Sequence, residues 1–290
     1  MNSLSVKKLT VAIGLFAGAV LSTNAFAGAV FLTGHDPDFH TQPGLGAGAN
    51  LLLAGISFVT GGTFDDASPA KKFLWVESNI AVPSGHVRGA SSLDDIGAVA
   101  GVNFDVVDAT GLVGVNFSDY SAIAIASSFG GTLTRAELDG LISRKEDIKS
   151  FINAGGGLFA SAECFPCGAN LLSGSTAPEL FGYLPISVTS IGANPPFTVT
   201  AAGAAAPFNL TNADVNDPTH NSFGATGGLT ILDTDAAGNA TTLAGNVRVG
   251  DGGFEPVPEP ASLALFCLGV VVLSVFRRRK SYSISNSIKH

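Results

Sequence analysis

The stretch that decides the fold is Gly155-Gly156-Gly157-Leu158-Phe159-Ala160-Ser161-Ala162-Glu163. Glycines readily adopt the backbone conformation that ends a helix, and the apolar residues after them predict a buried strand over Leu158–Glu163. Upstream, Thr134-Arg135-Ala136-Glu137 has the pattern of a capping box, in which the Thr and Glu side chains bond the first amides of a helix. The chain is therefore expected to run through one long helix and directly into a buried strand.

The same alternation recurs on the N-terminal side of this stretch. Strands are predicted over Ala29–Thr33, Phe73–Glu77, Asn103–Asp108 and Ser121–Ser127, and helices over Leu45–Thr60 and Ser92–Ala100. Strands that alternate with helices predict an α/β fold, with a mainly parallel sheet and helices on both faces. Beyond Leu172 the pattern weakens, and we expect antiparallel additions over Ile186–Ile191, Phe197–Thr200, Leu229–Leu232 and Thr242–Val249.

The N-terminal segment has the three parts of a secretory signal peptide. Lys7-Lys8 precede the apolar run Leu9–Leu21, and Ala25-Phe26-Ala27 places small residues at positions −3 and −1 of a cleavage site. We therefore expect residues 1–27 to be a signal peptide that is cut after Ala27. The α/β domain is then expected over residues 28–250, with a linker over 251–260.

The C-terminal segment begins with Val257-Pro258-Glu259-Pro260 and continues with the uncharged run Ala261–Phe276. At 1.5 Å per residue this run gives a helix of about 24 Å, which is short for a hydrocarbon core of about 30 Å. Arg277-Arg278-Arg279-Lys280 follow, and basic residues are held on the cytoplasmic side. The pattern predicts a short transmembrane helix over 261–276 and a basic cytoplasmic tail over 277–290.

The order of these C-terminal parts resembles the PEP-CTERM sorting signal of Gram-negative bacteria. The resemblance implies export, anchoring in the inner membrane, and recognition of Pro258, Glu259 and Pro260 by a membrane protease, an exosortase. Cleavage would remove the helix together with Arg277, Arg278 and Arg279, and would release the domain to the cell envelope or the extracellular matrix. The alternative is an ordinary single-pass anchor that is never cut.

The charge of the exported part restricts its partners. Residues 28–260 keep 8 of the 15 basic residues and all 23 acidic ones, a net charge of −15. Such a surface repels a phosphate backbone, which argues against nucleic-acid binding. Neutral, cationic or metal-bridged partners are expected instead.

Polar residues follow the predicted strands, at the edge where an open parallel sheet holds its ligands. His35, Asp36, Asp38 and His40 come directly after the first strand. Two imidazoles and two carboxylates could bind a divalent metal, zinc or calcium, if this loop curls. The alternative is a loop held by Asx-type turns, which we favour slightly over the metal.

Two cysteines follow the strand Leu158–Glu163. Cys164 and Cys167 form a Cys-x-x-Cys pair, which is typical both of thiol oxidoreductases and of a disulfide that closes a tight turn. In an oxidising compartment we favour the structural disulfide.

A glycine-rich helix exit, an apolar strand and Cys164 at the turn resemble the nucleophile turn of class I glutamine amidotransferase-like domains. Asp217-Pro218-Thr219-His220 resembles a late Asp and His segment of that superfamily, which includes ThuA-like proteins. If the domain is catalytic, the resemblance implies Cys164 as nucleophile, His220 or His86 as base, and Glu163, Asp36 or Asp38 in support. Phe165 and Pro166 stand where the family has glycine, and Asn221-Ser222 after His220 leave no His-x-Glu pair.

Three functions remain open on these observations. The first is a non-catalytic domain that binds a glycan or another envelope component, and the altered nucleophile turn favours it. The second is an exported cysteine-dependent hydrolase or transferase that acts on a carbohydrate or an amide. The third is a thiol–disulfide exchanger that uses Cys164 and Cys167.

Overall fold

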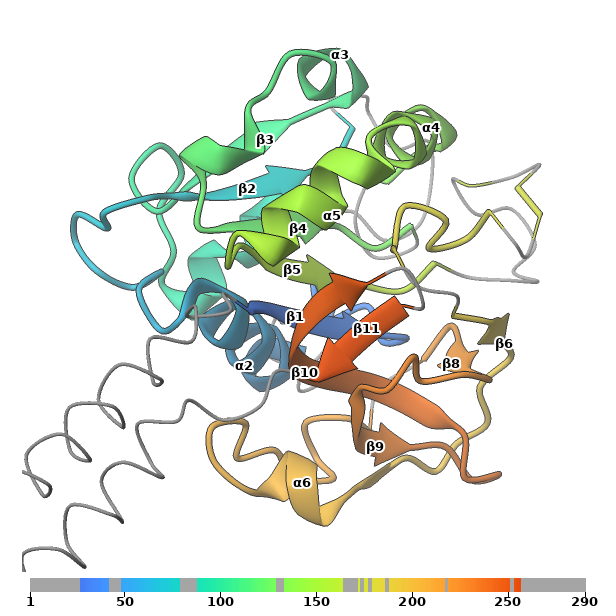
Figure 1. Ribbon diagram of the computed structural model, residues 1–290. Coiled ribbons are helices and arrows are strands. Elements are labelled where there is room, and N and C mark those ends of the chain that lie inside the picture. The colour runs from blue at the N-terminus through green and yellow to red at the C-terminus, as the bar shows by residue number, and fades with distance from the viewer. Residues whose placement is uncertain are drawn as a thin grey trace, which may run out of the picture. The chain divides into compact units, whose positions relative to one another are not determined.

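One mixed β-sheet organises the part of the chain that the computed structural model describes, in the strand order β3-β2-β4-β5-β1-β10-β8-β6 (Figure 1). The described residues are 27–41, 48–78, 88–128, 133–163, 172, 175–176, 179–185, 188–216, 219–250 and 253–256, all within the unit Phe26–Pro256. The strands are β1 (Gly28–Thr33), β2 (Phe73–Val76), β3 (Phe104–Val107), β4 (Ala122–Ile125), β5 (Gly157–Ala160), β6 (Ser190–Ile191), β7 (Thr198–Val199), β8 (Ser222–Phe223), β9 (Thr230–Thr234), β10 (Ala240–Gly250) and β11 (Gly253–Pro256).

The sheet has a parallel half and an antiparallel half. Strands β3, β2, β4, β5 and β1 lie parallel to their neighbours. Strand β10 pairs antiparallel with β1, and β8, β9 and β11 pair antiparallel with β10. The prediction of a mainly parallel sheet with antiparallel additions from the C-terminal part of the domain is therefore confirmed.

Both faces of the inner parallel strands β2, β4 and β5 and of β1 are buried, so successive side chains enter two different hydrophobic clusters. In β1, Val30 and Leu32 belong to one cluster and Phe31 to the other. In β5, Leu158 belongs to the cluster of Val30 and Leu32. Phe159 belongs to the other cluster and stacks on Phe31, with the ring centroids 5.7 Å apart. Each fully buried side chain of this size contributes about 1.5–3 kcal/mol. The two clusters together explain why these strands are almost wholly apolar.

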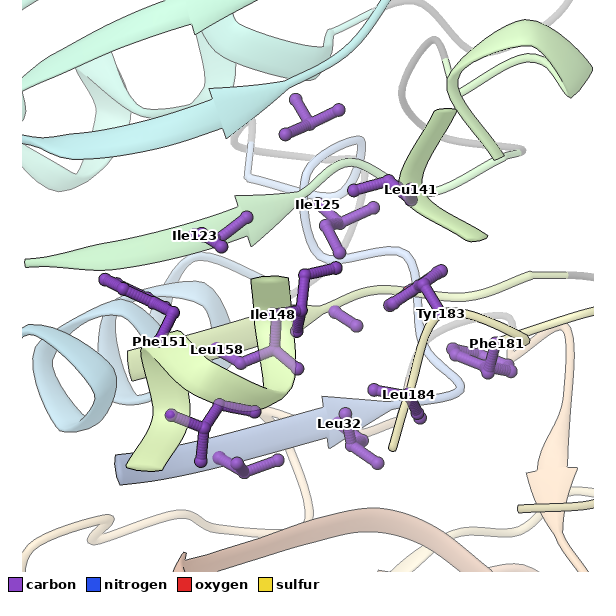
Figure 2. Packing of buried hydrophobic residues seen from close by; sticks show 14 of the residues in the cluster. Leu32, Ile123, Ile125, Leu141, Ile148, Phe151, Leu158, Phe181, Tyr183 and Leu184 are labelled. Atoms are coloured by element: carbon purple, nitrogen blue, oxygen red, sulfur yellow. The ribbon is translucent and has the colours of Figure 1, made fainter. Parts of the chain in front are cut away.

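Helices cover each face of the sheet, as the alternating pattern predicts. The described helices are α2 (Gly48–Thr60), α3 (Ala109–Leu112), α4 (Arg135–Ser143), α5 (Lys145–Asn153) and α6 (Ala201–Ala204), with 3-10 helices η1 (Gly89–Ser92), η2 (Asp94–Ile96) and η3 (Phe117–Asp119). Helix α2 packs in the cluster of Phe31, and α4 and α5 pack in the cluster of Leu32. Figure 2 shows Leu141 and Ile148 of these two helices directed toward the strand residues Ile123 and Ile125.

The long helix predicted after Thr134 is two helices. The capping box of Thr134 and Glu137 is present, but the helix is interrupted at Arg144, where φ is −105° and ψ is 18°. The guanidinium of Arg144 lies 3.9 Å from the centroid of the Phe117 ring and donates to the carbonyls of Leu112 and Val115. The interruption thus coincides with tertiary contacts that local sequence patterns do not contain.

Two further expectations need correction. The helix predicted over Ser92–Ala100 is replaced by η1 and η2, and Gly97, in the left-handed conformation with φ of 86°, ends η2 before Ala100 is reached. The linker predicted over 251–260 contains β11, which pairs with β10. No helix in the described ranges is long and apolar enough to cross a membrane, and the predicted segment 261–276 lies outside them.

Candidate functional site

Polar side chains gather where β1, β4 and β5 end, which we call the carboxyl edge. The loop after β1 supplies His35, Asp36, Asp38 and His40, and all four residues are buried. The antiparallel strands reach the same edge, because Thr33 of β1 lies opposite Thr242 of β10. The edge is therefore built from segments that lie far apart in the sequence.

Gly34 allows the segment that carries His220 to lie against the end of β1. The Gly34 carbonyl accepts hydrogen bonds from the amides of His220 (3.0 Å) and Asn221 (3.3 Å). A Cβ atom at residue 34 would lie 1.7 Å from the Asn221 carbonyl oxygen. This close approach requires glycine, and it brings His220 beside the loop after β1.

His35 links three segments through both of its ring nitrogens. Its Nδ1 lies 2.6 Å from Oγ1 of Thr219, and its Nε2 lies 3.0 Å from Oδ2 of Asp233. Asp233 also accepts a hydrogen bond from the hydroxyl of Thr241. His35 and Asp233 are fully enclosed, with side-chain exposures of 2% and 0%. The sequence reasoning missed Asp233 and Thr241, since neither belongs to a local motif.

Asp36 lies between two imidazoles. Its Oδ1 is 3.4 Å from Nε2 of His40, and its Oδ2 is 3.0 Å from Nε2 of His220. Both nitrogen–oxygen distances are short enough for ion pairs. The angles at these atoms do not fit hydrogen bonds to either oxygen of Asp36. Asp36 therefore connects its own loop to the His220 segment through charge, to the extent that an imidazole is protonated.

Asp38 connects the loop after β1 to the end of β4. Its Oδ2 accepts a hydrogen bond from the Ser127 amide at 2.9 Å. Burial raises the pKa of Asp38 to about 7, and the nearby charge of Asp36 adds to the effect. The hydrogen bonds from Ser127 favour the charged form but do not offset burial. Asp38 therefore changes its charge near neutral pH.

Glu163, three residues beyond the end of β5, has a separate set of partners. Its Oε2 accepts a hydrogen bond from the Phe181 amide at 2.6 Å, and the Tyr183 hydroxyl lies beside it. Burial raises the pKa of Glu163 to about 7, although both neighbours favour the charged form. The described contacts of Glu163 are with Phe181 and Tyr183, which belong to the cluster of Leu32 (Figure 2).

The structure brings some of the predicted site residues together and leaves others untested. His35, Asp36, His40 and His220 meet at the carboxyl edge. Cys164, Cys167, Asp217, His86 and the sorting residues Pro258, Glu259, Pro260 and Arg277–Arg279 lie outside the described residues, whereas Ala27 directly precedes β1. The assignments of nucleophile, disulfide and cleavage motif therefore stay predictions.

The four proposed metal ligands are divided among different partners. His35 pairs with Asp233, Asp36 contacts His40, and Asp38 bonds Ser127. Across the described ranges, no group of three or more His, Cys, Asp or Glu side chains has the arrangement that holds a metal ion. Binding of a divalent metal at this loop stays a prediction.

Comparison with known proteins identifies the C-terminal segment. A family model described as the PEP-CTERM protein-sorting motif matches residues 256–280. No curated protein and no solved structure matches the chain. The match supports an exported protein that carries an exosortase signal, and it begins at Pro256, the last residue of β11. The amidotransferase-like resemblance of the domain is supported by none of these comparisons.

Proposed function

We propose that this protein is an exported component of the cell envelope or extracellular matrix, with a non-catalytic domain that binds a glycan or another envelope component. An exosortase recognises the C-terminal motif and cuts the chain there. The observation that carries the sorting half of the proposal is the match of the PEP-CTERM model to residues 256–280.

The position of the motif in the fold supports release by proteolysis. Strand β11 ends at Pro256, and Pro258, Glu259 and Pro260 follow almost immediately. Cleavage beyond Pro256 would leave all described strands in the released product. A domain that is complete before the cut can keep its fold after losing the tail.

The closed depression beside the loop after β1 supports a non-catalytic role for the polar cluster. The depression beside His35, Asp36 and His40 has a volume of about 0 Å³, so its described lining leaves no room for a water-sized ligand. His35 is engaged at both ring nitrogens, by Thr219 and Asp233. We infer that these side chains hold the loops of the edge together.

One observation favours a hydrolase or transferase as the second candidate. Asp38 and Glu163 both have a pKa of about 7, which suits groups that exchange protons at neutral pH. In that case Cys164 is the nucleophile, and Cys164→Ala abolishes turnover of any carbohydrate or amide substrate that the protein cleaves. Activity that survives Cys164→Ala removes this candidate. A thiol–disulfide exchanger in turn requires a Cys164–Cys167 pair that cycles under mild reductant.

The test of the proposed function is the mass and location of the protein in cells with and without an exosortase. We expect the processed wild type to lack residues 261–290 and to leave the membrane fraction. The variant Glu259→Ala, within the motif, should stay membrane-bound at full C-terminal length. Glu255→Ala, just outside the matched residues, is the control and should be processed normally. A mature protein that still contains Ala261–Lys280 contradicts the proposal.

A further inference from the structure

A cleft of about 770 Å³ lies at the end of the sheet opposite the polar cluster, where β1 and β4 begin. We call it the amino-edge cleft. The end of α2 with Phe58 lines it, as do the segment Asn116–Ser121 before β4, helix α5, and Ala29 and Asn246 on paired strands. Its volume is within the range of about 300–1,000 Å³ that small-molecule sites occupy.

Two basic side chains line this cleft in a domain that is otherwise strongly acidic. The ammonium of Lys71 donates to the carbonyl oxygen of Ser118 at 2.6 Å, and no carboxylate of the described residues pairs with it. Arg144 is held over the Phe117 ring and pairs with Asp147 through its Nε at 2.9 Å. Because Asp147 offsets the charge of Arg144, Lys71 is the cation that an anionic ligand would meet.

Removal of the signal peptide would add a second positive charge. The predicted cut after Ala27 turns the nitrogen of Gly28 into an α-ammonium group. Ala27 and Ala29, on either side of Gly28, both line the cleft. Because Ala27 leaves with the signal peptide, the processed protein would carry an ammonium group one residue before Ala29, which lines the cleft together with Lys71.

The remaining lining combines aromatic rings with amide and hydroxyl groups. Phe58 and Tyr120 are half-buried, and Asn116, Ser150 and Asn246 are exposed. Sugars present apolar ring faces and many hydroxyl groups, which match aromatic side chains and amides respectively. A cation that lacks an acidic partner selects for a sugar that also carries a carboxylate.

We propose that the amino-edge cleft binds a segment of an acidic polysaccharide, with a sugar carboxylate at Lys71. This inference rests on the proposed function, in which the exported domain binds a glycan, and it names the class of glycan and its position. The net charge of the exported part favours neutral or cationic partners, so an acidic polymer is held only where Lys71 locally offsets that repulsion.

Calorimetric titration with oligogalacturonate tests this assignment, with its methyl ester as the neutral counterpart. The protein is used in the form in which the producing cell accumulates it. We expect the acid to bind at least about tenfold more tightly than the ester, and its affinity to fall as salt is added. Lys71→Gln should reduce this preference, because it leaves only the α-ammonium group near the cleft.

Lys72→Gln is the matched control, because Lys72 pairs with Asp105 at 2.8 Å and does not line the cleft. It should bind oligogalacturonate as the wild type does, and both variants should melt near the wild-type temperature. Failure of oligogalacturonate to bind, equal binding of the ester, or unchanged binding by Lys71→Gln overturns the assignment. None of these outcomes affects the sorting half of the proposed function, which the cellular processing of Glu259→Ala tests separately.

Discussion

Replacing Glu163 with glutamine measures how strongly the fold opposes a buried charge. In the unfolded chain this carboxyl group ionises with an ordinary pKa of 4.5, whereas burial raises the pKa to about 7 in the folded protein. As the pH rises from 4.5 to 7, the unfolded state loses the proton first. The contribution of the neutral Glu163 carboxyl to the free energy of unfolding is therefore fully present below pH 4.5. It is lost as the pH rises through about 7.

The size of this effect follows from the shift. A rise from 4.5 to about 7 corresponds to about 3 kcal/mol at 1.36 kcal/mol per unit. Glutamine has nearly the same shape, can still accept from the Phe181 amide, and does not ionise. We therefore expect Glu163→Gln to gain about 3 kcal/mol relative to wild type between pH 4.5 and pH 8. Urea unfolding of both proteins at the two pH values measures the difference.

Glu179→Gln is the control with the opposite sign. Glu179 is half-buried, and hydrogen bonds from Thr176 and Arg135 lower its pKa to about 2. Its stabilising effect is present above the ordinary pKa of 4.5 and is lost as the pH falls toward 2, so Glu179→Gln should be less stable than wild type at neutral pH. If the stability difference between Glu163→Gln and wild type is the same at pH 4.5 and pH 8, the reasoning about burial is wrong.

Three further predictions concern the fold and its processing. Gly34→Ala should lower the melting temperature strongly, because its methyl group would overlap a backbone carbonyl, whereas Gly114→Ala, with open space around it, should be nearly neutral by thermal denaturation. Phe159→Ala should cost about 3–5 kcal/mol in urea unfolding by leaving a cavity, and Val113→Ala, at a residue 84% exposed, should change stability by less than about 0.5 kcal/mol. The folded precursor should resist signal peptidase at Ala27, because β1 begins at the next residue and is paired on both sides, and a flexible spacer inserted after Ala27 should restore cleavage of the folded protein. Equal cleavage of the folded precursor with and without the spacer would show that β1 does not protect the site.

The sequence by itself determined the features that depend on neighbouring residues. The apolar strand predicted over Leu158–Glu163, which the structure has over Gly157–Ala160, and the capping box at Thr134 could be identified because burial on both faces and helix capping leave local patterns. The order of strands and helices was enough to predict a mainly parallel sheet. The sorting motif was equally readable, since a proline-containing motif, an apolar run and a basic cluster are contiguous in the chain.

Only the tertiary structure decided which distant groups meet. Asp233 bonds His35 across 198 positions of sequence, and that contact depends on the register of β9 and β10 against β1. The interruption at Arg144 and the amino-edge cleft likewise arise from packing between separate elements. Local patterns reflect hydrogen bonding and burial along one segment. Strand pairing brings together distant segments, and the sequence of one segment does not indicate which other segment it will pair with.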